Sequence, residues 1–121
     1  MNRLVIALLL LFSFSHLKSD ADTNYSLDTL PKFQARLVVS FNSICCGIDA
    51  KMHTKFTRFL KKNDNITYSK IYWGKEGEID YCFKLGELST EEQNKFVKKV
   101  KKTLGTNSRL ITIQENINCP R

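Results

Sequence analysis

The spacing of hydrophobic residues changes along this chain, and each change marks the border of an expected element. Residues 36–42 alternate between apolar and smaller or polar side chains, a period of two that predicts a strand with one buried face. Over residues 50–62 apolar side chains recur every three or four positions, which predicts an amphipathic helix. Asp49 precedes this helix and suits its N-cap, because its carboxylate can accept from free backbone N–H groups.

The middle of the chain predicts a β-hairpin. Residues 66–73 are rich in β-branched and aromatic side chains, and residues 78–85 alternate again. A turn with two glycines, residues 74–77, separates them. Both segments are therefore expected to be neighbouring antiparallel strands.

The last third predicts a second helix and a final strand. Ser89 followed by Glu92 forms the pattern of a capping box, in which each side chain satisfies a backbone donor of the other residue. An apolar stripe follows as far as Gly105, a suitable helix stop. Residues 109–117 then read as a strand.

The resulting order of strand, helix, strand, strand, helix, strand predicts an α+β fold of the ferredoxin-like βαββαβ type. With right-handed crossovers, the four antiparallel strands have the order 4-1-3-2. Both helices then cover the same face of the sheet, and the other face stays open.

The N-terminus predicts export. A basic start precedes an apolar run of about 11 residues, too short for a membrane span of roughly 20 residues but suited to a signal peptide. Small residues around Ala21 place cleavage after it, so residues 1–21 are the expected signal peptide. Residues 22–34 then form an N-terminal arm and residues 35–121 the domain. The protein is expected to be secreted or periplasmic, with no transmembrane span after signal removal.

The composition fits one globular domain with a basic surface. The chain has 121 residues, with 19 Lys and Arg against 12 Asp and Glu, a formal charge of +7. This charge indicates either an acidic partner or solvated helix faces rich in lysine. The lysines are not interleaved with aromatic residues, which argues against a nucleic-acid partner.

Four cysteines are expected to form disulfides in an oxidising compartment. Cys119 follows the last strand, so it lies about 25 Å from the far end of the antiparallel first strand, beyond the reach of Cys45 and Cys46. The predicted bridge is therefore Cys82–Cys119. Cys45 and Cys46 are left as a vicinal disulfide or as free thiols, whose pKa the helix N-terminus would lower. The competing arrangement is Cys46–Cys82.

The adjacent pair Cys45 and Cys46 is also a candidate site for a soft metal ion. It lies in the turn after the first strand, which resembles the metal-binding turn of heavy-metal-associated domains, whose topology is the same. In that family two residues separate the two cysteines, whereas here the cysteines are adjacent. The resemblance covers this turn alone. No other cofactor is expected.

The open sheet face is the other candidate site. It is expected to serve as a binding surface for an unknown protein or small ligand, or as the contact of a homodimer. The polar residues expected on this face are Ser40, Asn42, Asp80, Lys84 and Gln114.

No constellation of catalytic residues is legible, and His53 borders an apolar stripe, where histidines usually pack. The sequence therefore predicts a non-enzymatic binding domain. The alternative is a thiol-based metal-binding or redox protein that uses Cys45 and Cys46.

Overall fold

Six elements make up the computed structural model, which describes residues 32–105 and 107–120. They follow the predicted βαββαβ order. Their bounds are β1 Phe33–Phe41, α1 Ala50–Lys62, β2 Ser69–Tyr72, β3 Ile79–Phe83, α2 Thr90–Leu104 and β4 Ile111–Cys119. The predicted signal peptide, and all of the predicted arm before residue 32, lie outside the described residues. β1 begins at Phe33, three residues before the start of the strand predicted for this segment.

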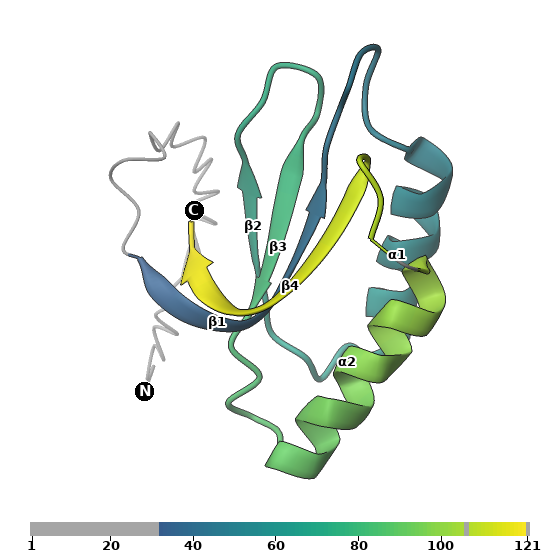
Figure 1. Cartoon of the computed structure of the whole chain (residues 1–121). Coiled ribbons are helices and arrows are strands. Elements are labelled where there is room, and N and C mark those ends of the chain that lie inside the picture. The colour runs from purple at the N-terminus through teal and green to yellow at the C-terminus, as the bar shows by residue number, and fades with distance from the viewer. Residues whose placement is uncertain (1–31, 106, 121) are drawn as a thin grey trace, which may run out of the picture.

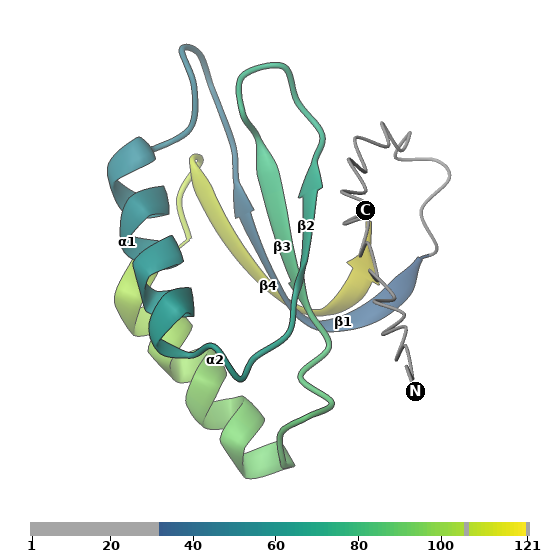
Figure 2. The same ribbon diagram turned by 180° about the vertical axis from the view of Figure 1, so that it is seen from behind.

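The sheet is antiparallel, with the strand order β2-β3-β1-β4. This is the predicted order 4-1-3-2 counted from the opposite edge, so the ferredoxin-like arrangement is confirmed. Both helices lie on one face of the sheet, and the reverse view shows the same two layers (Figures 1 and 2). Neither α1 nor α2, the helices of the described part, is long and apolar enough to cross a bilayer.

Both helices begin at the predicted caps. The Asp49 carboxylate accepts from the Met52 backbone N–H at 2.9 Å. The predicted capping box of α2 is present, with Ser89 and Glu92 each accepting from the other's backbone N–H. These contacts satisfy backbone donors that the first helical turn leaves without a partner, so local sequence determines where each helix starts.

The main core lies between the sheet and the helices, and aromatic rings fill its centre. The ring of Phe56 in α1 meets Tyr81 edge-on, with centroids 5.1 Å apart, and Phe83 lies 5.5 Å from Phe96 of α2. Edge-to-face pairs at this spacing add attraction to the burial of area. The inward-facing residues of the alternating segments are all in this core: Leu37, Val39 and Phe41 of β1, Ile79, Tyr81 and Phe83 of β3, and Leu85 just after β3.

A sharp bend in the paired strands β1 and β4 was not predicted. Neighbouring residues of a regular strand point to opposite faces, yet Leu37 lies in the main core and Arg36 also reaches α2, where its guanidinium donates to Asn94 at 3.0 Å. In β4, Asn116 has a φ of 55°, a left-handed conformation that asparagine tolerates better than most residues. The strands therefore change direction at this level, as the strong curve of β4 shows (Figure 1).

The bend creates a second, smaller core on the face opposite the helices. Its buried members are Ala35, Val38, Ile71, Cys82 and Cys119, with Phe33 and Ile117 packed against them. The expectation of a fully open sheet face is therefore wrong at this end, because the bent strand ends carry their apolar residues across it.

Candidate functional site

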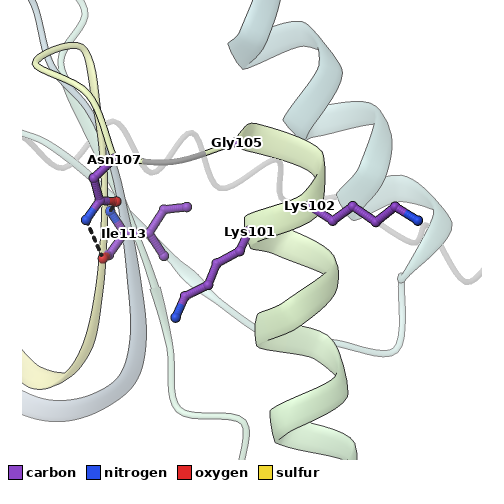
Figure 3. A pocket seen from close by; sticks show the side chains of 5 residues that line it. All are labelled: Lys101, Lys102, Gly105, Asn107 and Ile113. Carbon is purple, nitrogen blue, oxygen red and sulfur yellow. Dashed lines mark hydrogen bonds between the residues drawn. The ribbon is translucent and has the colours of Figure 1, made fainter.

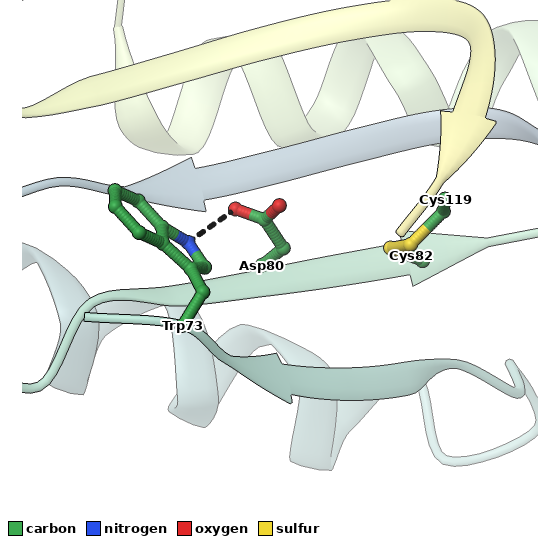
Figure 4. The surroundings of a disulfide bond; sticks show 4 residues. All are labelled: Trp73, Asp80, Cys82 and Cys119. Atoms are coloured by element: carbon green, nitrogen blue, oxygen red, sulfur yellow. Dashed lines mark hydrogen bonds between the residues drawn. A yellow bond between two sulfur atoms is a disulfide. The ribbon is translucent and has the colours of Figure 1, made fainter. Parts of the chain in front are cut away.

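The predicted Cys82–Cys119 disulfide is present and belongs to this smaller core. The two Cα atoms are 6.3 Å apart, and the bridge closes a separation of 37 residues. Figure 4 shows the end of β4 turning over β3 to reach Cys82. Both cysteines are buried, so the bridge is part of the packed structure. The competing Cys46–Cys82 arrangement is excluded in this structure.

The five polar residues expected on the open face are divided by burial. Ser40 is 0% and Asp80 3% exposed, whereas Gln114 lies in the solvent. The exposed Lys84 ammonium lies over the Phe33 ring, 4.5 Å from its centroid, a cation–π contact. Asn42 is half-buried and binds the backbone that leads into β4. These residues therefore do not form one continuous solvent-facing surface.

Ser40 and Asp80 are part of a buried polar row that crosses three strands. Ser40 is paired in register with Asp80 of β3 on one side and Thr112 of β4 on the other. The hydroxyl oxygens of Ser40 and Thr112 are buried and have no hydrogen-bond partner. The Trp73 indole N–H donates to the Asp80 carboxylate at 3.0 Å (Figure 4). Sequence reasoning missed the contact because Trp73 lies beyond the end of β2.

The candidate functional site lies at the end of the sheet where two loops extend side by side (Figures 1 and 2). One loop, residues 43–49, joins β1 to α1. The other part is the end of the β2–β3 hairpin, residues 72–78, which consists of the last residue of β2 and the turn. The Ser43 hydroxyl donates to the Glu76 carboxylate, which joins the two loops directly. We call these residues the two-loop tip.

Each loop of the two-loop tip is also held by its own polar contacts. The Ser43 hydroxyl accepts from the Gly47 backbone N–H at 3.2 Å, and Gly47 has a φ of 101°, which suits glycine. In the hairpin, the Glu78 carboxylate accepts from the Glu76 N–H at 2.8 Å. That carboxylate occupies the space where a side chain at Gly74 would lie, so a larger residue at this position would displace it.

The predicted cysteine pair is exposed on the two-loop tip. Cys45 and Cys46 are free thiols with their Sγ atoms 2.9 Å apart. Cys46 has a φ of 70°, an uncommon conformation for a residue with a side chain. The sequence left open whether these cysteines form a vicinal disulfide or are free thiols, and in the structure they are free thiols.

The expectation that the helix dipole lowers the thiol pKa is wrong for Cys45. Its pKa is raised, first by the hydrogen bond with Cys46, then by desolvation and by the negative charge of Glu76. The helical residues begin only at Ala50, and the dipole acts mainly within the first turn of a helix. Cys45 therefore holds its proton more tightly than an isolated thiol.

Exposed apolar side chains concentrate on the same two-loop tip. Ile44 is 58%, Tyr72 64% and Trp73 40% exposed. Among the described residues, the one other exposed large hydrophobic side chain is Tyr68, whose ring packs on Tyr81 and Phe83. Tyr72 and Trp73 are therefore exposed side by side in the chain, where β2 ends and the hairpin turn begins.

His53 packs against core residues and is not positioned as a reactive group on the surface. Its Nε2 lies 2.7 Å from the Tyr81 hydroxyl, and its ring meets Phe41 edge-on at 5.0 Å. Desolvation, with a smaller effect of Lys70, lowers the pKa of His53. Burial raises the pKa of Tyr81 to about 12. The pair therefore stays neutral near pH 7 and serves the core.

A pocket of about 430 Å³ lies between α2 and β4, away from the two-loop tip (Figure 3). Lys101, Lys102 and Gly105 line its helix side, and Asn107 and Ile113 line its strand side. Asn107 bonds both backbone groups of Ile113, and the Lys101 ammonium is paired with Glu115. These polar groups are therefore used within the fold.

Metal ligands do not gather elsewhere in the described part of the chain, where no group of three or more His, Cys, Asp or Glu side chains could hold an ion. Comparison with protein-family models, with curated proteins and with solved structures finds no match for this chain. The two-loop tip is therefore interpreted from its own chemistry.

Proposed function

We propose that this protein is a secreted or periplasmic, non-enzymatic binding domain that contacts a protein partner through its two-loop tip. The observation that carries the proposal is the exposure of Ile44, Tyr72 and Trp73 on two loops that are joined to one another. Exposed apolar clusters rimmed by polar groups are typical of interaction sites. Aromatic residues on a fixed frame are also the usual anchors of protein interfaces.

The neighbouring groups support a protein partner. Lys75 and Glu76 are exposed in the turn that follows Tyr72 and Trp73, so this loop also carries charged groups. The Ser43–Glu76 contact and the Glu78 contact restrain the two loops before binding. Restraint of a binding loop reduces the entropy lost on association. The surface is too exposed to enclose a small ligand, since pockets for such ligands are concave.

Photo-crosslinking tests this proposal. A photoreactive phenylalanine replaces Tyr72, and a matched control carries it at Lys99, an exposed position on α2. With exported proteins of the source cell, we expect a specific adduct from position 72 and none from position 99. Adducts from position 99 alone, or none at either position, would contradict the proposal.

The crosslinked partner then allows a quantitative test. We expect the double variant Ile44→Ser/Tyr72→Ser to weaken its affinity by about tenfold or more, since loss of an interface anchor costs on the order of 2 kcal/mol. Lys99→Ser should leave the affinity unchanged. Equal affinities for all three proteins would count against the two-loop tip.

The second candidate function is thiol chemistry at Cys45 and Cys46, supported by their exposure and by the 2.9 Å between their Sγ atoms. A metal ion is the less suitable partner. With metal–sulfur bonds of about 2.3 Å, sulfurs this close would give an angle of about 80° at the ion, well below the tetrahedral angle. Calorimetric titration with Zn²⁺ tests it: tight binding lost in Cys46→Ser would support a metal site.

A further inference from the structure

We propose that Cys45 and Cys46 form a dithiol site that reduces disulfides of small thiol compounds and is itself converted into a vicinal disulfide. This inference deepens the second candidate function and rests on thiol chemistry rather than on partner binding. It names the substrate class, an exposed disulfide, and the product, a bond between two adjacent residues.

Accessibility is the first requirement. Attack on a disulfide needs a thiolate that can approach one sulfur along the S–S axis, so a buried thiol reacts poorly. Cys45 and Cys46 are both exposed in a protruding loop (Figure 1). In contrast, Cys82 and Cys119 are fully buried and already joined. Exchange is therefore confined to the two-loop tip.

Proximity is the second requirement. A thiol that has formed a mixed disulfide is released when a neighbouring thiol attacks the protein sulfur. With the two Sγ atoms 2.9 Å apart, the second thiol is already in contact with that sulfur. Intramolecular attack at such distances has a large effective molarity compared with attack by free thiols. The vicinal disulfide should therefore form faster than the mixed disulfide can accumulate.

The exchange balances without a further reagent. One cysteine thiolate attacks the substrate disulfide, forms a protein–substrate S–S bond and expels the first substrate thiolate. The other cysteine loses its proton, attacks the protein sulfur of this bond and expels the second thiolate. Two electrons pass from the protein to the substrate, whose two sulfurs take up the two protons released.

The loop backbone supports the arrangement. Cys46 and Gly47 both have positive φ values, and Gly47 is held by the Ser43 hydroxyl, which also contacts Glu76. Adjacent side chains of an extended strand point to opposite faces. In this loop the turn brings the two thiols to the same side. The raised pKa of Cys45 implies that exchange accelerates as pH rises above neutrality, because the thiolate is the reacting form.

The experiment uses the full chain, with the buried bridge intact and the loop thiols reduced by mild reductant, and glutathione disulfide as the probe. We expect the protein to lose two hydrogen atoms, release two glutathione molecules and retain no adduct by intact mass. Peptide mapping should find Cys45 joined to Cys46. Cys45→Ser and Cys46→Ser should each retain one glutathione.

Other results would overturn the proposal. These are a stable glutathione adduct on the unaltered chain, a disulfide-linked dimer, a bond from the loop to Cys82 or Cys119, or no reaction. Alkylation by iodoacetamide distinguishes the two levels of failure. Thiols that alkylate but do not form the vicinal bond would contradict this inference alone, whereas thiols inert to both reagents would also remove the second candidate function.

Discussion

Two residues with unpaired buried hydroxyls lie on the face of the sheet opposite the helices. Buried hydroxyls normally have a hydrogen-bond partner, because an unpaired one loses its contacts with water and gains nothing in return. The hydroxyl oxygens of Ser40 and Thr112 are buried without such a partner. They lie beside Asp80, which accepts from the Trp73 indole. In the described part of the chain, this row therefore contains the buried side-chain groups that lack a hydrogen-bond partner.

Removing one of these hydroxyls should stabilise the protein. Val has nearly the shape of Thr without the hydroxyl, so we expect Thr112→Val to raise the free energy of unfolding by about 1 kcal/mol. The matched control is Thr103→Val, since the Thr103 hydroxyl donates to the Lys99 carbonyl at 2.8 Å. Urea denaturation measures both. A loss of stability in Thr112→Val would mean that its hydroxyl is satisfied in solution.

The Tyr81 hydroxyl should make stability dependent on alkaline pH. Its pKa is 10.0 in the unfolded chain and about 12 in the fold, mainly through burial. Since the raised value favours the protonated form in the folded state, this contribution is complete below pH 10 and is lost as pH rises towards 12. We expect Tyr81→Phe to lose less stability than the unaltered protein between pH 10 and 11 in urea titrations. Identical slopes in this window would contradict the assignment.

Among the elements, the paired strands β1 and β4 depart most from regular geometry. Asn116 adopts a positive φ in the middle of a nine-residue strand, and β4 curves after it. The Arg36 guanidinium meets the Glu115 carboxylate at 2.6 Å and Lys101 meets it at 2.5 Å, so β1, β4 and α2 are joined beside the bend. Both contacts lower the pKa of Glu115. β4 is therefore bent at a defined position, beside Glu115 and Asn116.

Asn116 should be sensitive to a β-branched residue. A left-handed conformation costs most residues about 1–2 kcal/mol more than it costs asparagine or glycine. We expect Asn116→Val to lower the free energy of unfolding by about that amount and Asn116→Gly to leave it nearly unchanged. Asn118→Val, at another exposed position of β4, is the control. Thermal unfolding compares the three, and equal losses at positions 116 and 118 would argue against strain at the bend.

In the whole molecule, the bend and the Cys82–Cys119 bridge close one end of the sheet, and the two-loop tip forms the opposite end (Figures 1 and 4). Stability and proposed chemistry are thus separated by the length of the strands. The buried cysteines hold the bent strand ends, while the exposed pair lies where two loops meet. Changes at one end should affect the other little.

Removal of the bridge should therefore be costly and removal of the loop thiols harmless. In the chain-entropy account a bridge across 37 residues stabilises the folded state by about 4 kcal/mol. We expect Cys82→Ala/Cys119→Ala to lose stability of this order, measured by urea denaturation. Cys45→Ser/Cys46→Ser should remain within about 0.5 kcal/mol of the unaltered protein, as is usual for exposed positions. Comparable losses in both double variants would contradict this division.

Local sequence determined the elements and the fold of this protein. Caps at Asp49 and Ser89 begin both helices where the sequence predicts, and alternation in β1 and β3 selects the core residues. Each of these signals acts between residues that are near in the chain, so it can be read without the fold. Chain order and the short hairpin then leave few topologies, and the predicted strand order is present.

Only the tertiary structure decided which residues are exposed, buried or in contact at the two ends of the sheet. The Ser43–Glu76 contact joins residues 33 positions apart, and the burial of Ser40 and Asp80 depends on segments remote in sequence. The bend at Asn116 could not be predicted from the alternation of apolar and polar residues, because the bend interrupts that alternation. Even the predicted Cys82–Cys119 bridge followed from the assumed fold, since cysteine spacing does not fix pairing. Sites made of contacts between distant loops therefore appear only once the chain is folded.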